Sequence, residues 1–362
     1  MTKKATKSKK PISASKGTAL KKFVWALVGV ILLSITVIGW ELYQQVYRSN
    51  VSLNNPEERS YLEIPTGSDF PTVLEILRQN NILRDITSFE WVARQLGYPE
   101  KVKPGRYPIL KGDSNFDIVR MLAAGRQEPV KLVINRFRSR EDFFGAVGRK
   151  LEADSAELAA IFTDETWLRT FGLLPEESFA VIIPNTYELY WNTNGKEFFE
   201  RMHKEYQSFW TQERVAKAKD LGLREVEVMK LASIVDEETN KEDEKEVIAG
   251  VYLNRLKIDM PLQADPTVRF AHNDFSIKRV TGVHLRLKSP YNTYQVIGLP
   301  PGPICTPSIA SIDAVLNAEK HSFLYFCAKE DFSGYHRFAI TYPEHQKNAR
   351  LYQMALENRK IY

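Results

Sequence analysis

Residues 231–239 read LASIVDEET, and their apolar spacing predicts a helix that ends in three consecutive acids. Projected around that helix, Glu238 falls among the apolar side chains, whereas Asp236 and Glu237 fall outside the apolar stripe. We therefore expect only Glu238 to face the core of its domain. A buried ionised carboxylate is costly, so such a group is paired, bound to a metal or kept protonated by a raised pKa.

A carboxyl group that stays protonated near neutral pH is what a general acid for glycosidic bond cleavage requires. Glu238 is therefore the candidate catalytic residue. Periodicity alone leaves two structural alternatives open. In the first, Glu238 lies beyond the helix end in solvent. In the second, it caps the helix that follows.

The long stretch 259–310 is rich in proline, glycine, asparagine and tyrosine and shows little periodicity, which in a folded domain usually indicates a functional segment. Aromatic rings, amides and hydroxyls are the groups that bind sugars. Each of them is also compatible with ordinary loop capping or partial burial. The candidate substrate-binding residues in and before this stretch are Asn254, Gln263, Asp265, Thr267, Tyr291, Asn292, Thr293 and Tyr294.

Other kinds of chemistry find little support in the sequence. The histidines show none of the spacings typical of metal sites, and neither a nucleophile elbow nor a phosphate-binding loop is present. We therefore expect no metal and no cofactor. The two cysteines, Cys305 and Cys327, either form a disulfide bond or are two separate small residues.

The net charge of +5 is concentrated at the N-terminus, because residues 1–22 hold eight lysines and no acid. Removing those eight from the 50 basic residues leaves 42 against 45 acids, a net charge of −3 for the rest of the chain. A body with this balance is not built to bind a polyanion, so nucleic acid is not expected as a ligand.

Residues 23–43 are long and apolar enough to cross a bilayer as a helix, with no charge in 23–40, a single acid at Glu41 and tryptophans toward both ends. The lysines precede this run, which places residues 1–22 in the cytoplasm as a basic tail and the rest outside. The alternative is a cleaved signal peptide, but its apolar region is usually shorter and ends at small residues. We expect a single uncleaved transmembrane helix.

The remainder predicts an α+β protein with two outer parts. Residues 60–125 alternate short strands with helices and form a small module that serves as a binding platform or a folded spacer. Residues 130–350 form a larger mixed α+β domain with a helix over about 196–219, two helices within 225–257 and paired strands at 323–328 and 336–340.

Several motifs in this order closely resemble the endolytic murein transglycosylase (YceG-like) family. They are ASIVDEETNKEDE at 232–244, VIAGVYLNRLKIDMPLQADPTVRFA at 247–271 and YNTYQVIGLPPGPICTPS at 291–308. The resemblance also makes the 60–125 module similar to the LysM-like subdomain of that family. This sequence departs from the family pattern at Asp236, where a glutamate is usual, and at Asn185, where an aspartate is usual.

The resemblance implies a lyase of the bacterial cell wall in which Glu238 is the catalytic acid and base. Its substrate would be the peptidoglycan glycan strand, cut between MurNAc and GlcNAc to leave 1,6-anhydroMurNAc ends that terminate elongation. The protein would work at the inner membrane, with its catalytic domain in the periplasm and a peptidoglycan synthase as a further partner. Two alternatives remain: a muramidase that uses Asp265 as its second carboxylate, and a membrane-anchored scaffold that binds peptidoglycan without cutting it.

Overall fold

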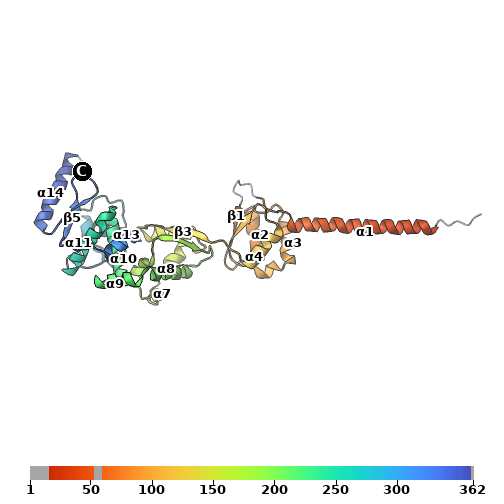
Figure 1. Cartoon of the computed structure of the whole chain (residues 1–362), viewed down its shortest axis with the longest axis horizontal. Helices are drawn as coiled ribbons and strands as arrows, with labels where there is room; N and C mark the ends of the chain where they lie inside the picture. Colours follow the sequence, from red (N-terminus) through yellow and green to blue (C-terminus); the bar gives the residue numbers. More distant parts are fainter. Residues whose placement is uncertain (1–15, 53–58, 360–362) are drawn as a thin grey trace, which may run out of the picture. The chain divides into compact units, whose positions relative to one another are not determined.

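The computed structural model describes residues 16–52 and 59–359 of the chain, which form two compact units divided between Glu128 and Pro129. Helices and strands are mixed in both units, as predicted (Figure 1). Most of the predicted basic tail, residues 1–15, lies outside the described residues.

The first unit begins with α1 (Lys16–Tyr47), a single unbroken helix (Figure 1). Residues Leu20–Tyr47 of this helix are long and apolar enough to cross a membrane, and their apolar window is not buried in the protein. Trp40 stacks on Tyr43 at a ring-centroid distance of 6.0 Å, so aromatic side chains gather where the apolar run ends.

A small module follows α1 within the same unit. Strand β1 (Arg59–Ile64) pairs antiparallel with β2 (Gly105–Leu110), with Leu62 opposite Tyr107. Four helical segments complete the module: α2 (Phe70–Gln79), α3 (Ile86–Gln95), the 3-10 turn η1 (Tyr98–Lys101) and α4 (Asn115–Ala124). Aspartate or serine caps the helices, and at α4 Ser114 and Asp117 form a reciprocal capping box. Apolar side chains from both strands and all these helices form one core.

The second unit opens with a two-stranded sheet, in which β3 (Val130–Ile134) pairs antiparallel with β4 (Asn185–Leu189). Between and after these strands lie α5 (Arg140–Gly148), α6 (Ser155–Ile161), α7 (Glu165–Arg169), η2 (Pro175–Val181), α8 (Gly195–Phe209) and α9 (Gln212–Asp220). The single helix predicted over 196–219 is wrong. It is two helices, because the chain breaks at Trp210 and the Thr211 side chain caps α9.

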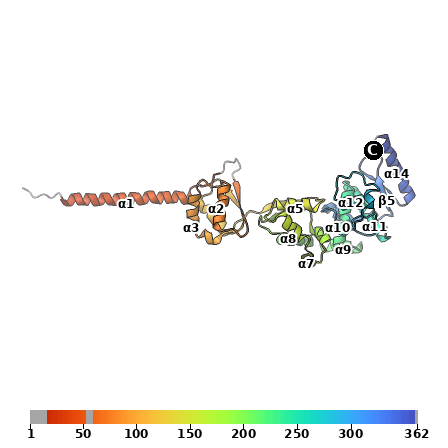
Figure 2. The same cartoon turned by 180° about the vertical axis from the view of Figure 1, so that it is seen from behind.

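The rest of the second unit is built around α10 (Glu225–Glu238). This helix packs against α13 (Ile309–Leu316), α11 (Lys245–Lys257) and α12 (Asp265–Ala271). Figure 1 shows α11 and α13 beside α10, and Figure 2 shows α11 and α12 beside it. Strands β5 (Tyr325–Ala328) and β6 (His336–Ala339) form the predicted antiparallel pair, and α14 (Tyr342–Asn358) packs on them. Short 3-10 turns η3 (Glu242–Glu244) and η4 (His284–Arg286) lie in the connections.

Candidate active site

Glu238 is the last residue of α10, and its side chain meets a tyrosine from the next helix. The Tyr252 hydroxyl donates a hydrogen bond of 2.6 Å to Oε1 of Glu238. Tyr252 lies on α11 and is 1% exposed, with its ring edge against Phe326 at 5.8 Å. Glu238 itself stays partly accessible. The carboxyl group is therefore held from the protein side by a fixed donor, in a residue that keeps part of its surface exposed.

The surroundings raise the pKa of Glu238 from its ordinary value of 4.5 to about 7. Burial is the largest cause, because it penalises the charged form. The hydrogen bond from Tyr252 works in the opposite direction, the negative charge of Asp265 raises the pKa further, and the nearby cations Arg269 and Arg255 lower it. A carboxyl group with this pKa is close to half protonated at neutral pH, which suits it to both giving and taking a proton.

Arg255 is a buried cation beside this carboxyl group. Its Nε donates to the carbonyl of Leu324 at 2.7 Å, and its Nη1 donates to the carbonyl of Leu262 at 2.5 Å. Burial lowers the pKa of Arg255. Because its donors are held by backbone carbonyls, Arg255 joins α11 to the loop before α12 and to β5, and it acts on Glu238 as a fixed charge.

Asp236 lies two residues before Glu238, and its environment acts in the opposite sense. Its Oδ1 accepts hydrogen bonds from the hydroxyls of Ser308 (2.5 Å) and Ser311 and lies 3.3 Å from the ammonium of Lys245. Burial works to raise the pKa of Asp236, but the two serines, Lys245 and Arg136 outweigh it, and the pKa of Asp236 is lowered. Asp236 is therefore an ionised structural anchor between α10, α11 and the start of α13.

This burial corrects one inference from the sequence. Asp236 was expected to lie outside the buried stripe, but it is only 4% exposed. The side chain of Glu237 is 8% exposed and pairs with Arg138 at 2.9 Å and Arg136 at 3.5 Å. The expectation was wrong because α10 is enclosed on nearly all sides by neighbouring helices, so its burial is not confined to one stripe.

Three of the predicted substrate-binding residues are wholly buried and bond to one another or to the backbone. Thr267 and Thr293 share a hydrogen bond of 2.8 Å between their hydroxyls. Thr293 also accepts from the amide of Ala264, and Asn292 donates to the carbonyls of Leu285 and Leu287. These side chains bind the segments 262–267 and 285–294 together.

The other predicted residues are more accessible. The Tyr294 hydroxyl donates to Oδ1 of Asp265 at 2.6 Å, and this carboxylate adds to the electrostatic field on Glu238. Gln263 is exposed and has a φ of 50°. Tyr291 is partly exposed and packs on Phe270 at 4.7 Å.

Asn254 is a partly exposed residue whose amide is already engaged. Its Nδ2 donates to the backbone carbonyls of His321 (2.8 Å) and Phe323 (3.1 Å). The substrate contacts assigned to these eight residues stay a prediction. Five of the eight are at least partly exposed: Asn254, Gln263, Asp265, Tyr291 and Tyr294.

The segment before α13 lies against α10 and η2. The backbone N–H of Ile304 donates to the hydroxyl of Ser233 on α10 at 3.0 Å. A Cβ added at Gly302 would lie 1.9 Å from the carbonyl oxygen of Glu176, so only glycine fits there. The proline-rich segment 299–303 is therefore packed closely against α10 and η2.

Sequence reasoning missed Tyr252, Arg255 and Arg269, which shape the environment of Glu238. Tyr252 and Arg255 read as ordinary residues of a helix, whereas Arg269 lies in the stretch with little periodicity, and nothing in their spacing points to position 238. Cys305 and Cys327 are free thiols. Within residues 16–52 and 59–359, no cluster of three or more histidine, cysteine or acidic side chains is arranged to hold a metal.

Comparison with known proteins decides the family. The model of the YceG-like family matches residues 62–351. The chain belongs to the YceG-like family. This confirms the resemblance seen in the sequence motifs, and the matched range includes both the small module and the segment around Glu238.

Two curated relatives and one solved structure resemble this YceG-like chain. The endolytic murein transglycosylase of Bacillus subtilis (strain 168) is 27% identical over 310 residues, which cover 80% of this chain and 84% of the relative. The one of Streptococcus pneumoniae (strain D39) is 27% identical over 91% of this chain and 65% of the relative. A crystal structure of a YceG-like protein from Listeria monocytogenes has a TM-score of 0.52 and 26% identity, covering 80% of this chain and 99% of that one.

Proposed function

We propose that this protein is an endolytic peptidoglycan lytic transglycosylase in which Glu238 is the single catalytic acid and base. The observation that carries the proposal is a carboxyl group with a pKa of about 7, buried against Tyr252 yet still accessible. Its position in the family supports the same conclusion, because curated relatives are named endolytic murein transglycosylases.

The proposed reaction uses one carboxyl group twice. Protonated Glu238 gives its proton to the oxygen that links MurNAc to GlcNAc, and positive charge develops on the MurNAc ring as the bond breaks. The resulting carboxylate then takes the proton of the MurNAc C6 hydroxyl, whose oxygen attacks the anomeric carbon. The products are a GlcNAc hydroxyl end and a 1,6-anhydroMurNAc end. No water is consumed, and Glu238 regains its proton.

The neighbouring acids support a one-carboxyl mechanism. A hydrolase of the usual kind needs a second carboxylate to activate water or to attack the sugar. Asp236 is tied to two serines and Lys245, and Glu237 is paired with two arginines. Asp265 is the remaining candidate, and its Oδ1 already accepts from Tyr294. We assign Asp265 to the electrostatic environment of Glu238.

The glycan strand is proposed to lie over the accessible loop residues near Glu238. Gln263, Asp265, Tyr291 and Tyr294 would contact it, since amides, carboxylates and aromatic faces are the groups that hold sugars. The buried set Thr267, Asn292 and Thr293 would shape the loop from beneath, together with Asn254, which holds the 321–323 segment.

The anchor sets where this reaction takes place. We propose that α1 crosses the inner membrane once, with residues 1–22 in the cytoplasm and both outer parts in the periplasm, because the lysines precede the apolar run. We also propose that the 60–125 module is LysM-like and binds glycan, on the basis of an antiparallel strand pair packed with α2 and α3. An active site tethered to the membrane would reach nascent strands beside a synthase and end their elongation.

The decisive experiment is digestion of purified sacculi by the full chain and by Glu238→Gln, with mass analysis of the products. We expect 1,6-anhydroMurNAc ends from the wild type and none from Glu238→Gln. Glu246→Gln, the same change at an exposed position on α11, is the matched control and should keep full activity. Undiminished turnover by Glu238→Gln would refute the assignment.

The two alternatives give different results in the same experiment and in cells. A muramidase would leave reducing ends in place of anhydro ends. If the protein is a non-catalytic scaffold, the inactive Glu238→Gln variant should restore function in cells as well as the wild type does.

A further inference from the structure

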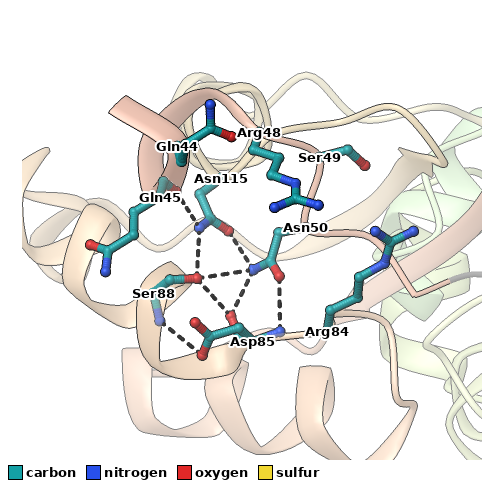
Figure 3. Close-up of a pocket in the computed structure, with 9 residues that line it drawn as sticks. All are labelled: Gln44, Gln45, Arg48, Ser49, Asn50, Arg84, Asp85, Ser88 and Asn115. Carbon is teal, nitrogen blue, oxygen red and sulfur yellow. Dashed lines mark hydrogen bonds between the residues drawn. The ribbon is translucent and has the colours of Figure 1, made fainter. Parts of the chain in front are cut away.

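A pocket of about 360 Å³ lies in the first unit, where α1 meets the small module (Figure 3). Gln44 and Arg48 line it from the end of α1, and Asn115 lines it from the first turn of α4. Arg84 and Asp85 line it from the residues just before α3. No residue of the second unit takes part, so this pocket is separate from the Glu238 site.

The floor of the pocket is a closed hydrogen-bond network. The buried amide of Asn50 donates to the carbonyl of Asp85 at 2.6 Å and to Oδ1 of Asn115 at 2.8 Å, and its own oxygen accepts from the amide of Asp85 at 2.8 Å. Asn115 in turn donates to the carbonyl of Gln45 on α1 at 2.9 Å. Figure 3 shows these bonds linking α1, α3 and α4 at one point. The pocket is therefore preorganised.

The two arginines at the pocket are, by contrast, unengaged. Within residues 16–52 and 59–359, neither the guanidinium of Arg48 nor that of Arg84 has a hydrogen bond or an ion pair, and Figure 3 draws none to either. The carboxylate of Asp85 also lines the pocket, but it accepts from the amides of Thr87 and Ser88 and caps α3. Two free, exposed arginines against one engaged aspartate leave a site that attracts an anion, and a guanidinium group matches phosphate oxygens in particular.

The position of the pocket along α1 indicates which phosphate-containing molecules lie near it. A helix rises 1.5 Å per residue, so Arg48 lies about 8 Å beyond Tyr43, where the apolar run ends. The headgroup layer on each side of a bilayer is about 5–7 Å thick. The ring of Tyr47 also packs on Phe116 of the module at 5.3 Å, so the module begins at that level. If α1 spans the bilayer, Arg48 lies at about the outer edge of the headgroup layer, within reach of the lipid phosphates.

We propose that this pocket binds the phosphate group of an anionic membrane lipid, with Arg48 and Arg84 as its ligands. The inference rests on the proposed membrane anchoring of α1. Two sources share this chemistry: the phosphodiester of an anionic phospholipid, and the pyrophosphate that joins a polyprenyl carrier to a sugar chain. Either one would fix the height and orientation of the module at the membrane surface.

The test measures binding of four probes to the full chain in a neutral detergent: a short-chain phosphatidylglycerol, a short polyprenyl pyrophosphate, a short-chain phosphatidylcholine and inorganic phosphate. The variant is Arg48→Gln with Arg84→Gln. The matched control is Lys101→Gln with Arg126→Gln, which removes two exposed charges of the same module that do not line the pocket. We expect about tenfold weaker binding of a lipid phosphate by the pocket variant and little change in the control.

The tighter of the two lipid probes identifies the source. The proposal is overturned if the pocket variant binds both lipid phosphates as well as the control does, if neither lipid binds to the wild type, or if inorganic phosphate or phosphatidylcholine binds equally well. Incorporation of the wild type into neutral vesicles and its activity on sacculi are measured separately. Failure of either of those would contradict the proposed function, whereas loss of binding selectivity alone contradicts only the pocket.

Discussion

The hydroxyl of Tyr252 lies 2.6 Å from Oε1 of Glu238, although the two residues belong to different helices. This bond favours the ionised form of Glu238, whereas burial and Asp265 favour the protonated form. The pKa near 7 is therefore a balance of opposing contributions. Removing either kind should move it in a known direction.

Tyr252→Phe removes the hydrogen bond but keeps the buried ring. Because that bond lowers the pKa of Glu238, the alkaline limb of the pH–rate profile should move to higher pH by about one unit. The measurement is anhydro-product formation between pH 5 and 9. Tyr107→Phe, which removes a buried, hydrogen-bonded tyrosine hydroxyl in the small module, should leave the limb in place. A shift to lower pH in Tyr252→Phe would contradict the positioning role given to Tyr252.

Asp265→Asn should move the same limb the other way. The charge of Asp265 raises the pKa of Glu238, so its removal should shift the limb to lower pH by about half a unit and leave substantial turnover at pH 6. Asp274→Asn, at an exposed aspartate just after α12, is the control. Loss of turnover at every pH in Asp265→Asn would instead favour a mechanism with two carboxylates.

Glu238 should also make the stability of the folded protein depend on pH. Its folded pKa of about 7 exceeds the ordinary 4.5, so its stabilising contribution is complete below pH 4.5 and is lost as the pH rises toward 7. Glu238→Gln lacks this loss. We expect the variant to be about 2 kcal/mol more stable than the wild type at pH 8, after a discount for the partial access of water, and equally stable near pH 4.5. Denaturant unfolding at the two values measures the difference, and a gap independent of pH would disprove the raised pKa.

Asp236→Asn should cost stability. It leaves the ammonium of Lys245, which is 4% exposed, with only the exposed carboxylate of Glu242 as a partner, and we expect a loss of about 2 kcal/mol in the free energy of unfolding. The alkaline limb of the remaining activity should stay where it is in the wild type. Asp220→Asn, at an exposed position that ends α9, should change neither quantity. Wild-type stability in Asp236→Asn would mean that this network does not hold α10 to α11 and α13.

The sequence could predict the parts of the fold that depend on local pattern. The apolar anchor, the two helices around η3 and the pair β5–β6 each follow from spacing and turn residues within a short window. The break at Trp210 was missed because the apolar period continues through Phe209, although Thr211, whose side chain caps α9, is a local signal of a new helix. Helices α12 and α13 lie in a stretch whose prolines and glycines hide the helical period.

The site was predictable only in part, for a related reason. An acid at an apolar position marks Glu238 by local pattern. Tyr252 is 14 residues away on another helix, and its sequence context is that of any core aromatic residue. Asp236 was misplaced because a helical projection assumes one buried side, whereas α10 is enclosed by helices that the projection does not include. Both errors have the same cause: the neighbours of Glu238 and Asp236 come from segments that are distant in the sequence.

The junction at Tyr47 has a mechanical consequence. Because α1 runs without interruption to the module and is bonded to it through Asn115 and the Ser49–Ser114 bridge, the tether has no slack at that point. With α1 in a bilayer, as proposed, the module would stay at a constant distance from the membrane surface and would move only by lateral diffusion. Its search for a polymer growing from the same surface would then be two-dimensional, which raises the effective concentration of each partner for the other.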